Sequence, residues 1–196
     1  MDHVTLSDGV VTLTPFRAGD ADAHLAGEDE QLVRWLAGKP STRASVEEYI
    51  RRCTAQWAYR GPSRVFGIRT GPEPVLAGTI DLRFVMPCLA PGQVNIAYGL
   101  YPAWRGHGLV TRAVRLVCRY AAEEGAAQGV IRVHPENLAS AAVARRTGFR
   151  YAGPLTEPSG ERLDWYVRDL VAGPATGPDV DAPGAVGEGL AHARTI

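Results

Sequence analysis

The stretch YPAWRGHGLVT, residues 101–111, decides the fold of this chain. A strand-like run, VNIAYGL at residues 94–100, leads into it, and an amphipathic helical pattern follows it. Gly106 and Gly108 let the backbone turn sharply and leave its amide N–H groups uncovered by side chains. Because these groups then open a helix, whose unpaired donors and dipole attract anions, the turn predicts a phosphate-binding site. It is neither the nucleoside triphosphate loop, since no Gly-Lys-Ser/Thr follows, nor the dinucleotide fingerprint, since the glycine spacing differs.

The segments after the turn predict a βαβ unit. The helix runs to about Glu124 and stops at Gly125, and a short strand follows at residues 130–133. Two neighbouring strands of one sheet that are connected through such a helix pair in parallel. The apolar stripe of the helix is expected to consist of Val110, Val114, Val117 and Ala121.

The remaining patterns predict an alternation of further strands and helices. A hairpin is expected around the turn at residues 71–74. Further strands are predicted at residues 10–15, 65–69, 75–84, 149–151 and 163–167. Further helices are predicted from an Asp20 cap to Leu25, from Gln31 to Leu36, from Ser45 to Gly61-Pro62, and from Asn137 to about Arg146.

The C-terminal segment differs in composition from the rest of the chain. Residues 171–196 contain no aromatic residue and repeat alanine, glycine and proline. Such a segment buries too little apolar area to offset ordering costs of about 1–2 kcal/mol per residue. We therefore expect a domain over residues 1–170 and a flexible tail over residues 171–196.

Composition excludes several classes of function. The 196 residues are 45% hydrophobic and 21% charged, with 21 basic and 21 acidic side chains and no formal net charge. No global field would attract nucleic acid or anionic lipid, and no apolar run reaches the length of a membrane span. Three widely spaced cysteines suggest neither a disulfide framework nor a zinc site, so no metal is expected. The N-terminus lacks the pattern of a signal peptide, which makes the cytoplasm the expected location.

Three motifs in order carry a resemblance to a known family. RGHGLV at residues 105–110 resembles the R/Q-x-x-G-x-G/A motif of the GNAT superfamily of acyl-CoA-dependent N-acyltransferases. HPENLAS at residues 134–140 and ARRTGFRYAG at residues 144–153 resemble the later signature of one branch. That branch is similar to the bacterial Rim-type acetyltransferases of ribosomal-protein N-termini. The order of predicted elements over roughly residues 10–170 is also the GNAT order.

The resemblance implies a fold and a reaction. The fold would be α/β (α+β), with a mixed central sheet of six to seven strands and about four helices, splayed at the strand that binds acetyl-CoA. The reaction would move an acetyl group from acetyl-CoA to a primary amine, on a protein N-terminus or a small molecule. The acceptor cleft would lie between the first two helices and the loop near residues 150–163. Edge strands near the C-terminus could pair in a homodimer.

The resemblance also implies roles for particular residues. The turn would hold the pyrophosphate, and the strand before it would pair its backbone with pantetheine. Asn137, a good helix cap on any fold, would also bond a pantetheine amide, and Ser140 would protonate or position the sulfur. Basic side chains on the helix are either a solvated face or a contact for the 3′-phosphate. The cofactor-binding residues are Tyr98, Gly99, Leu100, Arg105, Gly106, His107, Gly108, Leu109, Val110, Thr111 and Asn137, and the basic side chains are Arg112, Arg115 and Arg119.

The chain departs from the family pattern at the expected catalytic positions. Asn95 stands where relatives often carry Glu. We place Asn95 in the catalytic set with Ser140, but its amide cannot accept a proton. Ala144 stands where many relatives carry an acidic Tyr, Val110 replaces a small residue, and Arg112 replaces Glu. The candidate replacement bases are Asp81, Glu136, His107 and His134. These departures keep two alternatives open: a CoA-binding sensor or regulatory module without turnover, and a different acyl donor such as succinyl-CoA.

Overall fold

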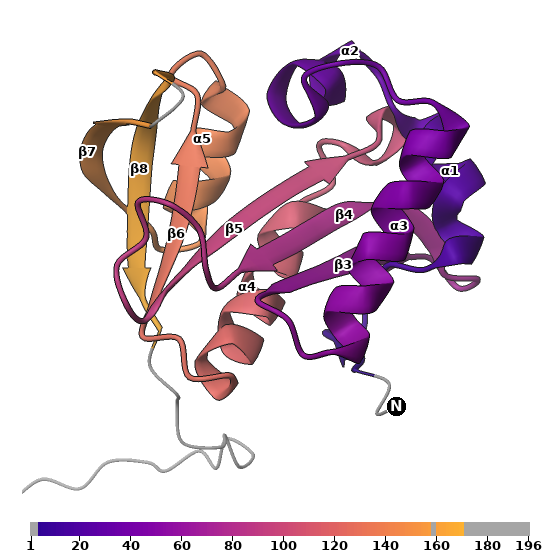
Figure 1. Cartoon of the computed structure of the whole chain (residues 1–196), viewed down its shortest axis with the longest axis horizontal. Coiled ribbons are helices and arrows are strands. Elements are labelled where there is room, and N and C mark those ends of the chain that lie inside the picture. Colours follow the sequence, from indigo (N-terminus) through magenta and orange to yellow (C-terminus); the bar gives the residue numbers. More distant parts are fainter. Residues whose placement is uncertain (1–3, 158–159, 171–196) are drawn as a thin grey trace, which may run out of the picture.

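The computed structural model describes residues 4–157 and 160–170. In this part of the chain eight strands form one sheet, in the order β1-β2-β3-β4-β5-β6-β8-β7 (Figure 1). All neighbours pair antiparallel except β5 and β6, which are parallel and flank helix α4, as the βαβ prediction requires. The strands are β1 (Leu6–Ser7), β2 (Val11–Pro15), β3 (Ser63–Thr70), β4 (Val75–Arg83), β5 (Gln93–Leu100), β6 (Gln128–Val133), β7 (Arg150–Thr156) and β8 (Arg162–Asp169).

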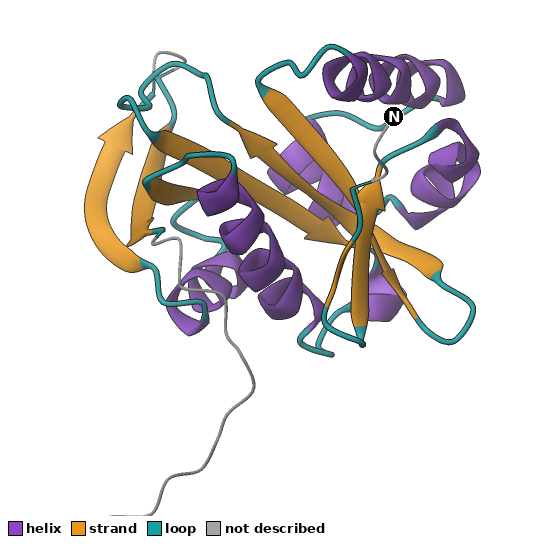
Figure 2. Cartoon of the chain, turned by 90° about the horizontal axis from the view of Figure 1, so that it is seen from below, coloured by secondary structure: helices purple, strands orange, loops and turns teal. Residues whose placement is uncertain are grey.

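Helices cover both faces of the sheet (Figures 1 and 2). One face carries the larger core, in which α4 packs on the sheet and on α5. The other face carries a smaller core beneath α1 and α3. The helices are α1 (Ala21–Gly27), α2 (Glu30–Leu32), α3 (Arg43–Ala58), α4 (Leu109–Glu123) and α5 (Leu138–Arg146), with short turns η1 (Ala18–Asp20), η2 (Val33–Ala37) and η3 (Pro102–Trp104). None of the helices in the described part of the chain is long and apolar enough to cross a membrane.

The mixed α/β fold is confirmed, with two corrections to its count of elements. The sheet has eight strands in place of six to seven, because the two-residue β1 is too short to leave a pattern in the sequence. The described residues form five α-helices in place of about four, and the predicted helix at 31–36 is divided between α2 and the π-helical turn η2. The predicted flexible tail, residues 171–196, lies outside the described residues.

The start of α3 was predicted two residues late. Thr42 is the N-cap: its hydroxyl accepts from Ser45 N (3.2 Å), and the Ser45 hydroxyl accepts in return from Thr42 N (2.9 Å). Ser45 is therefore the third helical residue and the far half of a capping box rather than the cap. The helix also ends at Ala58, before the predicted Gly61-Pro62 stop.

Asp20 precedes a helix, as predicted, but its side chain does not cap that helix. Both carboxylate oxygens accept from Nη2 of Arg69 on β3 at 2.8 Å, and Oδ2 also accepts from Arg17 N (3.0 Å). Asp20 and Arg69 are only 4% and 6% exposed. This buried ion pair ties the entrance of α1 to the sheet.

The apolar stripe of α4 differs from the prediction at its first member. Val114, Val117 and Ala121 are fully buried, as expected, but Val110 is only half-buried and faces a cleft. Leu109, which is 4% exposed, begins the buried stripe instead. The first turn of α4 thus divides its side chains between the core and the cleft.

Gly78 brings β4 close to β5, and we expect Gly78→Ala to destabilise the fold by about 3 kcal/mol, at the upper end of the usual range for overpacking. A Cβ at this position would lie 2.2 Å from Gly99 O and 2.9 Å from Leu100 Cα, both backbone atoms. Urea unfolding gives the free energy, and Gly19→Ala is the control, since a Cβ there meets nothing within 4 Å. Equal stability of the two variants would contradict this close approach of β4 and β5.

Candidate functional site

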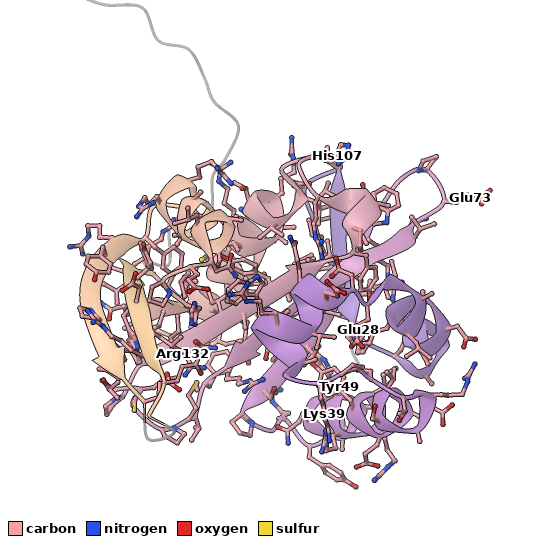
Figure 3. The ribbon with its side chains drawn as sticks, turned by 90° about the horizontal axis from the view of Figure 1, so that it is seen from above. Glu28, Lys39, Tyr49, Glu73, His107 and Arg132 are labelled. Atoms are coloured by element: carbon pink, nitrogen blue, oxygen red, sulfur yellow. The ribbon has the colours of Figure 1, made fainter. Side chains whose placement is uncertain are left out.

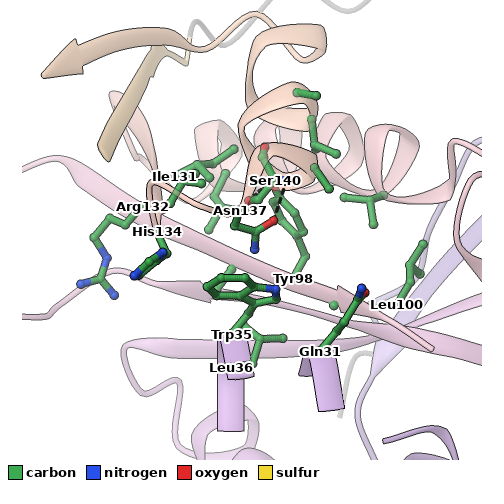
Figure 4. A pocket seen from close by; sticks show the side chains of 18 of the residues that line it. Gln31, Trp35, Leu36, Tyr98, Leu100, Ile131, Arg132, His134, Asn137 and Ser140 are labelled. Carbon is green, nitrogen blue, oxygen red and sulfur yellow. Dashed lines mark hydrogen bonds between the residues drawn. The ribbon is translucent and has the colours of Figure 1, made fainter. Parts of the chain in front are cut away.

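A cleft opens where β5 and β6 separate. The two strands pair only over Gln93–Asn95 and Gln128–Val130, although β5 continues to Leu100 and β6 to Val133. The cavity between them has a volume of about 1320 Å³ and extends to α5, η2 and the turn before α4 (Figure 4). Beyond Asn95 one edge of β5 still pairs with β4, while the other faces the cleft. The splay expected at this strand is therefore present.

Side chains of β5 alternate between the two faces of the sheet. Toward one face, a Cβ on Gly99 would lie 2.6 Å from side-chain carbons of both Leu32 and Leu36, so the glycine lets α2 and η2 pack directly on the strand. Toward the other face, the Tyr98 hydroxyl reaches Ser140 on α5. The cleft thus joins a face covered by α2 and η2 to a face covered by α5.

The glycine turn adopts the conformation that the sequence predicts. Gly106 and Gly108 have φ of +79° and +73°, and both line the cleft. A Cβ on either would meet nothing within 4 Å, so open space lies beside the turn. Gly108 is the N-cap of α4, and the first helical hydrogen bond runs from Arg112 N to Gly108 O (3.3 Å). The N–H groups of Leu109, Val110 and Thr111 therefore have no partner within the helix.

Two residues of the turn have surroundings that the sequence did not indicate. Arg105 donates from both terminal nitrogens to Asp29 (2.7 and 2.8 Å) and from Nε to Leu100 O (3.0 Å), so its side chain ties α2 to the end of β5. These bonds from Arg105 lower the pKa of Asp29 to about 2. His107 is exposed and does not line the cleft (Figure 3). Leu109, Val110 and Thr111 do line it.

The first turn of α5 brings together three of the predicted residues (Figure 4). Asn137 caps the helix, with Oδ1 accepting from Ser140 N (3.0 Å). The Ser140 hydroxyl lies 3.1 Å from the Tyr98 hydroxyl, which also donates to Ser140 O (3.2 Å). Burial raises the pKa of Tyr98 from its ordinary value of 10.0 to about 12, and at either value the phenol is protonated at neutral pH. Sequence reasoning considered only the backbone of Tyr98; the alternation along β5 could have indicated the direction of its side chain, but not its partner.

Asn95 belongs to a polar group at the end of the cleft opposite the glycine turn. It is 2% exposed, lines the cleft, and accepts at Oδ1 from Arg132 Nε (2.9 Å). Arg132 also pairs with Glu157. On β4, Arg83 Nε donates to the buried Asp81 (2.9 Å). Burial raises the pKa of Asp81, although the charge of Arg83 opposes the shift.

The other candidate bases have separate environments. His134 lines the cleft and packs on Trp35 of η2, with ring centroids 5.1 Å apart (Figure 4). Glu136 lines it too and forms an exposed ion pair with Arg34. Asp81 itself does not line the cleft, but its partner Arg83 does.

The basic stripe on α4 divides into two parts. Arg112 pairs with Asp8 at 2.9 Å, beside β1 and β2. Arg115 and Arg119 line a second, smaller depression together with Arg146 and Arg168. No group of three or more metal-binding side chains occurs among residues 4–157 and 160–170.

Comparisons with known proteins agree with this geometry. The family model for the acetyltransferase (GNAT) domain matches residues 11–150. Over 112 residues the chain is 35% identical to the probable N-acetyltransferase YjcK of Bacillus subtilis strain 168, an alignment that covers 57% of this chain and 59% of the relative. The chain therefore spans less than two thirds of that relative's length.

Solved structures share the fold at low sequence identity. RimL, a ribosomal L7/L12 α-N-protein acetyltransferase in complex with coenzyme A, matches with a TM-score of 0.73 and 18% identity, over 87% of this chain and 100% of that one. An acetyltransferase from Salmonella typhimurium that modifies the N-terminal serine of L7/L12 matches with a TM-score of 0.72 and 18% identity, over 85% and 99%. The microcin C7 self-immunity acetyltransferase MccE, in complex with acetyl-CoA and AMP, matches with a TM-score of 0.70 and 18% identity, over 83% and 94%.

Proposed function

Because this chain belongs to the GNAT acetyltransferase family, we propose that it transfers an acetyl group from acetyl-CoA to a primary amine. The observation that carries the proposal is the open edge of β5, which leads directly into a glycine turn at a helix N-terminus. An extended chain with a phosphate group at one end fits this combination: the strand edge offers backbone hydrogen bonds, and the helix offers unpaired N–H groups.

The donor would lie along the cleft with its pyrophosphate at the glycine turn. The backbone N–H groups of Gly108, Leu109, Val110 and Thr111 would hold the phosphates, and the backbone of Tyr98, Gly99 and Leu100 would pair with pantetheine. Asn137 is already the cap of α5, so its NH2 group is the part that would reach a pantetheine amide. Arg105 would support the turn through Asp29 rather than bind phosphate itself.

Attack of a neutral amine on the thioester carbonyl places negative charge on the carbonyl oxygen. A backbone N–H at the cleft edge of β5 would stabilise that oxyanion, a contribution of about 2.7–4 kcal/mol in comparable enzymes. The departing thiolate then needs a proton. The protonated Tyr98 phenol, hydrogen-bonded to Ser140, would supply or relay it, which gives the chain an acid despite Ala144.

The acceptor ammonium must lose a proton before attack, and Asn95 cannot take it. Asp81, Glu136 and His134 are the candidates that lie at the cleft or pair with a side chain that lines it. The exposed His107 does not line the cleft, so it would not serve as this base.

We expect Tyr98→Phe to lower kcat about 100-fold, which is the lower end of the usual contribution of general acid catalysis. The variant keeps the aromatic ring and loses only the hydroxyl that contacts Ser140. Steady-state kinetics measures the effect, and Tyr59→Phe, at a tyrosine that is 86% exposed, is the matched control. Wild-type kcat in Tyr98→Phe would remove this residue from the mechanism.

The proposed function is tested by incubating the protein with acetyl-CoA and a panel of amines, with products detected by mass. The panel contains amino acids, amino sugars and peptides with free N-termini. Acetylation of any one of them supports the enzyme. Tight acetyl-CoA binding without transfer to the whole panel would instead favour a CoA-binding sensor, and parallel titration with succinyl-CoA decides the acyl donor. The homodimer and the cytoplasmic location stay predictions.

A further inference from the structure

Three hydrogen-bond donors from neighbouring strands meet at the end of the cleft opposite the glycine turn. Arg83 on β4 lies directly across from Asn95 on β5, and Asn95 pairs with Val130 on β6, two residues before Arg132. The hydrogen bond between Arg132 and Asn95 places these two side chains on one face. Arg83, Asn95 and Arg132 all line the cleft.

Existing hydrogen bonds fix how these donors are presented. Arg132 occupies the Asn95 oxygen, so the amide offers its NH2 group on the other side. Among the described residues Arg83 makes one hydrogen bond, from Nε to Asp81, which leaves its two terminal nitrogens for a ligand. The Arg83 side chain is 49% exposed, and it is held at Nε by Asp81, whose side chain is 11% exposed. The result is an oriented guanidinium beside an oriented amide donor.

Donors in this arrangement match a carboxylate. A guanidinium binds a carboxylate through two parallel N–H···O bonds, and the amide NH2 supplies a further donor to the same group. Asp81 and Glu157 already pair with Arg83 and Arg132, so a bound carboxylate would share the Arg83 guanidinium with Asp81 through different nitrogens.

The position of Arg83 and Asn95 in the cleft limits the length of a ligand that binds them. Asn95 is the last residue of β5 that pairs with β6, and Tyr98 follows three residues later, about 10 Å along the strand. This is a distance along the backbone, and the long Arg83 side chain lines the cleft while the acyl group of the donor would extend from pantetheine, so we expect the amine and the anionic group of the acceptor to lie much closer together than this.

We propose that the acceptor is a small amino acid, whose carboxylate binds Arg83 and Asn95 while its amine faces the thioester. This inference rests on the proposed acetyl transfer and narrows its acceptor. A protein N-terminus presents no carboxylate of this kind next to its amine, because the first carboxyl group is in a peptide bond.

The test compares the twenty L-amino acids with their carboxamides and with tripeptides that begin with the same residues. Acetylated products are quantified by mass, and kcat/KM is measured for the best acid and its matched amide. We expect the acid to exceed the amide and the peptide at least tenfold. In Arg83→Gln this ratio should fall at least tenfold, and in Arg83→Lys, which keeps the charge, it should fall less. Arg51→Gln is the control, since Arg51 is exposed on α3 and pairs with Glu48.

The possible results distinguish failure of the carboxylate site from failure of the proposed acetyl transfer. Amides or peptides acetylated as fast as the acids, or equal losses for acid and amide in Arg83→Gln, would overturn the carboxylate site while leaving acetyl transfer intact. Failure to acetylate any amine, by protein that binds acetyl-CoA, would overturn the proposed function and this inference with it.

Discussion

Acetyl-CoA binding is expected to weaken at least 100-fold when Gly108 is replaced by tryptophan. Gly108 lines the cleft and a Cβ there would meet nothing within 4 Å, so we expect an indole at this position to compete with the pyrophosphate for space. The helical N–H groups would remain but would be covered. A 100-fold loss corresponds to about 2.8 kcal/mol of binding free energy. Isothermal titration calorimetry on the folded variant measures it.

The other end of the same helix provides a matched control for this variant. Gly125 also has a positive φ (+90°), also has nothing within 4 Å of its Cβ position, and does not line the cleft. Gly125→Trp therefore introduces the same side chain and a similar backbone strain, of about 1–2 kcal/mol. Its affinity for acetyl-CoA should equal that of the wild type. Equal affinities of Gly108→Trp and Gly125→Trp would place the phosphate site elsewhere.

Asp20→Asn is expected to lower the free energy of unfolding by about 3–5 kcal/mol, the usual loss when one partner of a buried ion pair is removed. The substitution keeps the size of the side chain but leaves the Arg69 guanidinium charged and buried without a carboxylate. Because the free energy of unfolding of a native protein is about 5–15 kcal/mol, the expected loss is a large fraction of the total stability. Urea unfolding at neutral pH measures it.

Two further variants separate the ion pair from other effects of Asp20→Asn. Asp22→Asn breaks an ion pair with Arg43 in which both side chains are exposed, and should leave the unfolding midpoint in place. Adding Arg69→Met to Asp20→Asn removes the unpaired buried charge of Arg69 and should recover most of the lost stability. A double variant less stable than Asp20→Asn would show that the buried charge is not the cause.

Local rules allowed the sequence to predict much of the fold. Positive φ at Gly106 and Gly108, the cap at Asn137 and the stop at Gly125 all depend on residues within one turn of each other. The parallel pairing of β5 with β6 follows from the helix between them. These features could be read directly because glycine and capping residues have narrow structural preferences.

Contacts between distant segments could not be read in the same way. Asp20 looked like a helix cap, yet its partner Arg69 lies 49 residues away. Tyr98 and Ser140 are 42 residues apart, and Arg132 reaches Asn95 across 37. Each pair forms because the sheet order places its strands or helices side by side, and no local pattern encodes that order for a single side chain.

Calorimetric titration of acetyl-CoA into the wild-type protein is the most direct test of the proposed donor site. The open edge of β5 and the glycine turn predict micromolar binding, about −8 kcal/mol, with one site per chain. The titration can be carried out without knowing the acceptor. No heat of binding at millimolar acetyl-CoA, from protein shown to be folded, would contradict the proposed donor site and the acetyl transfer that depends on it.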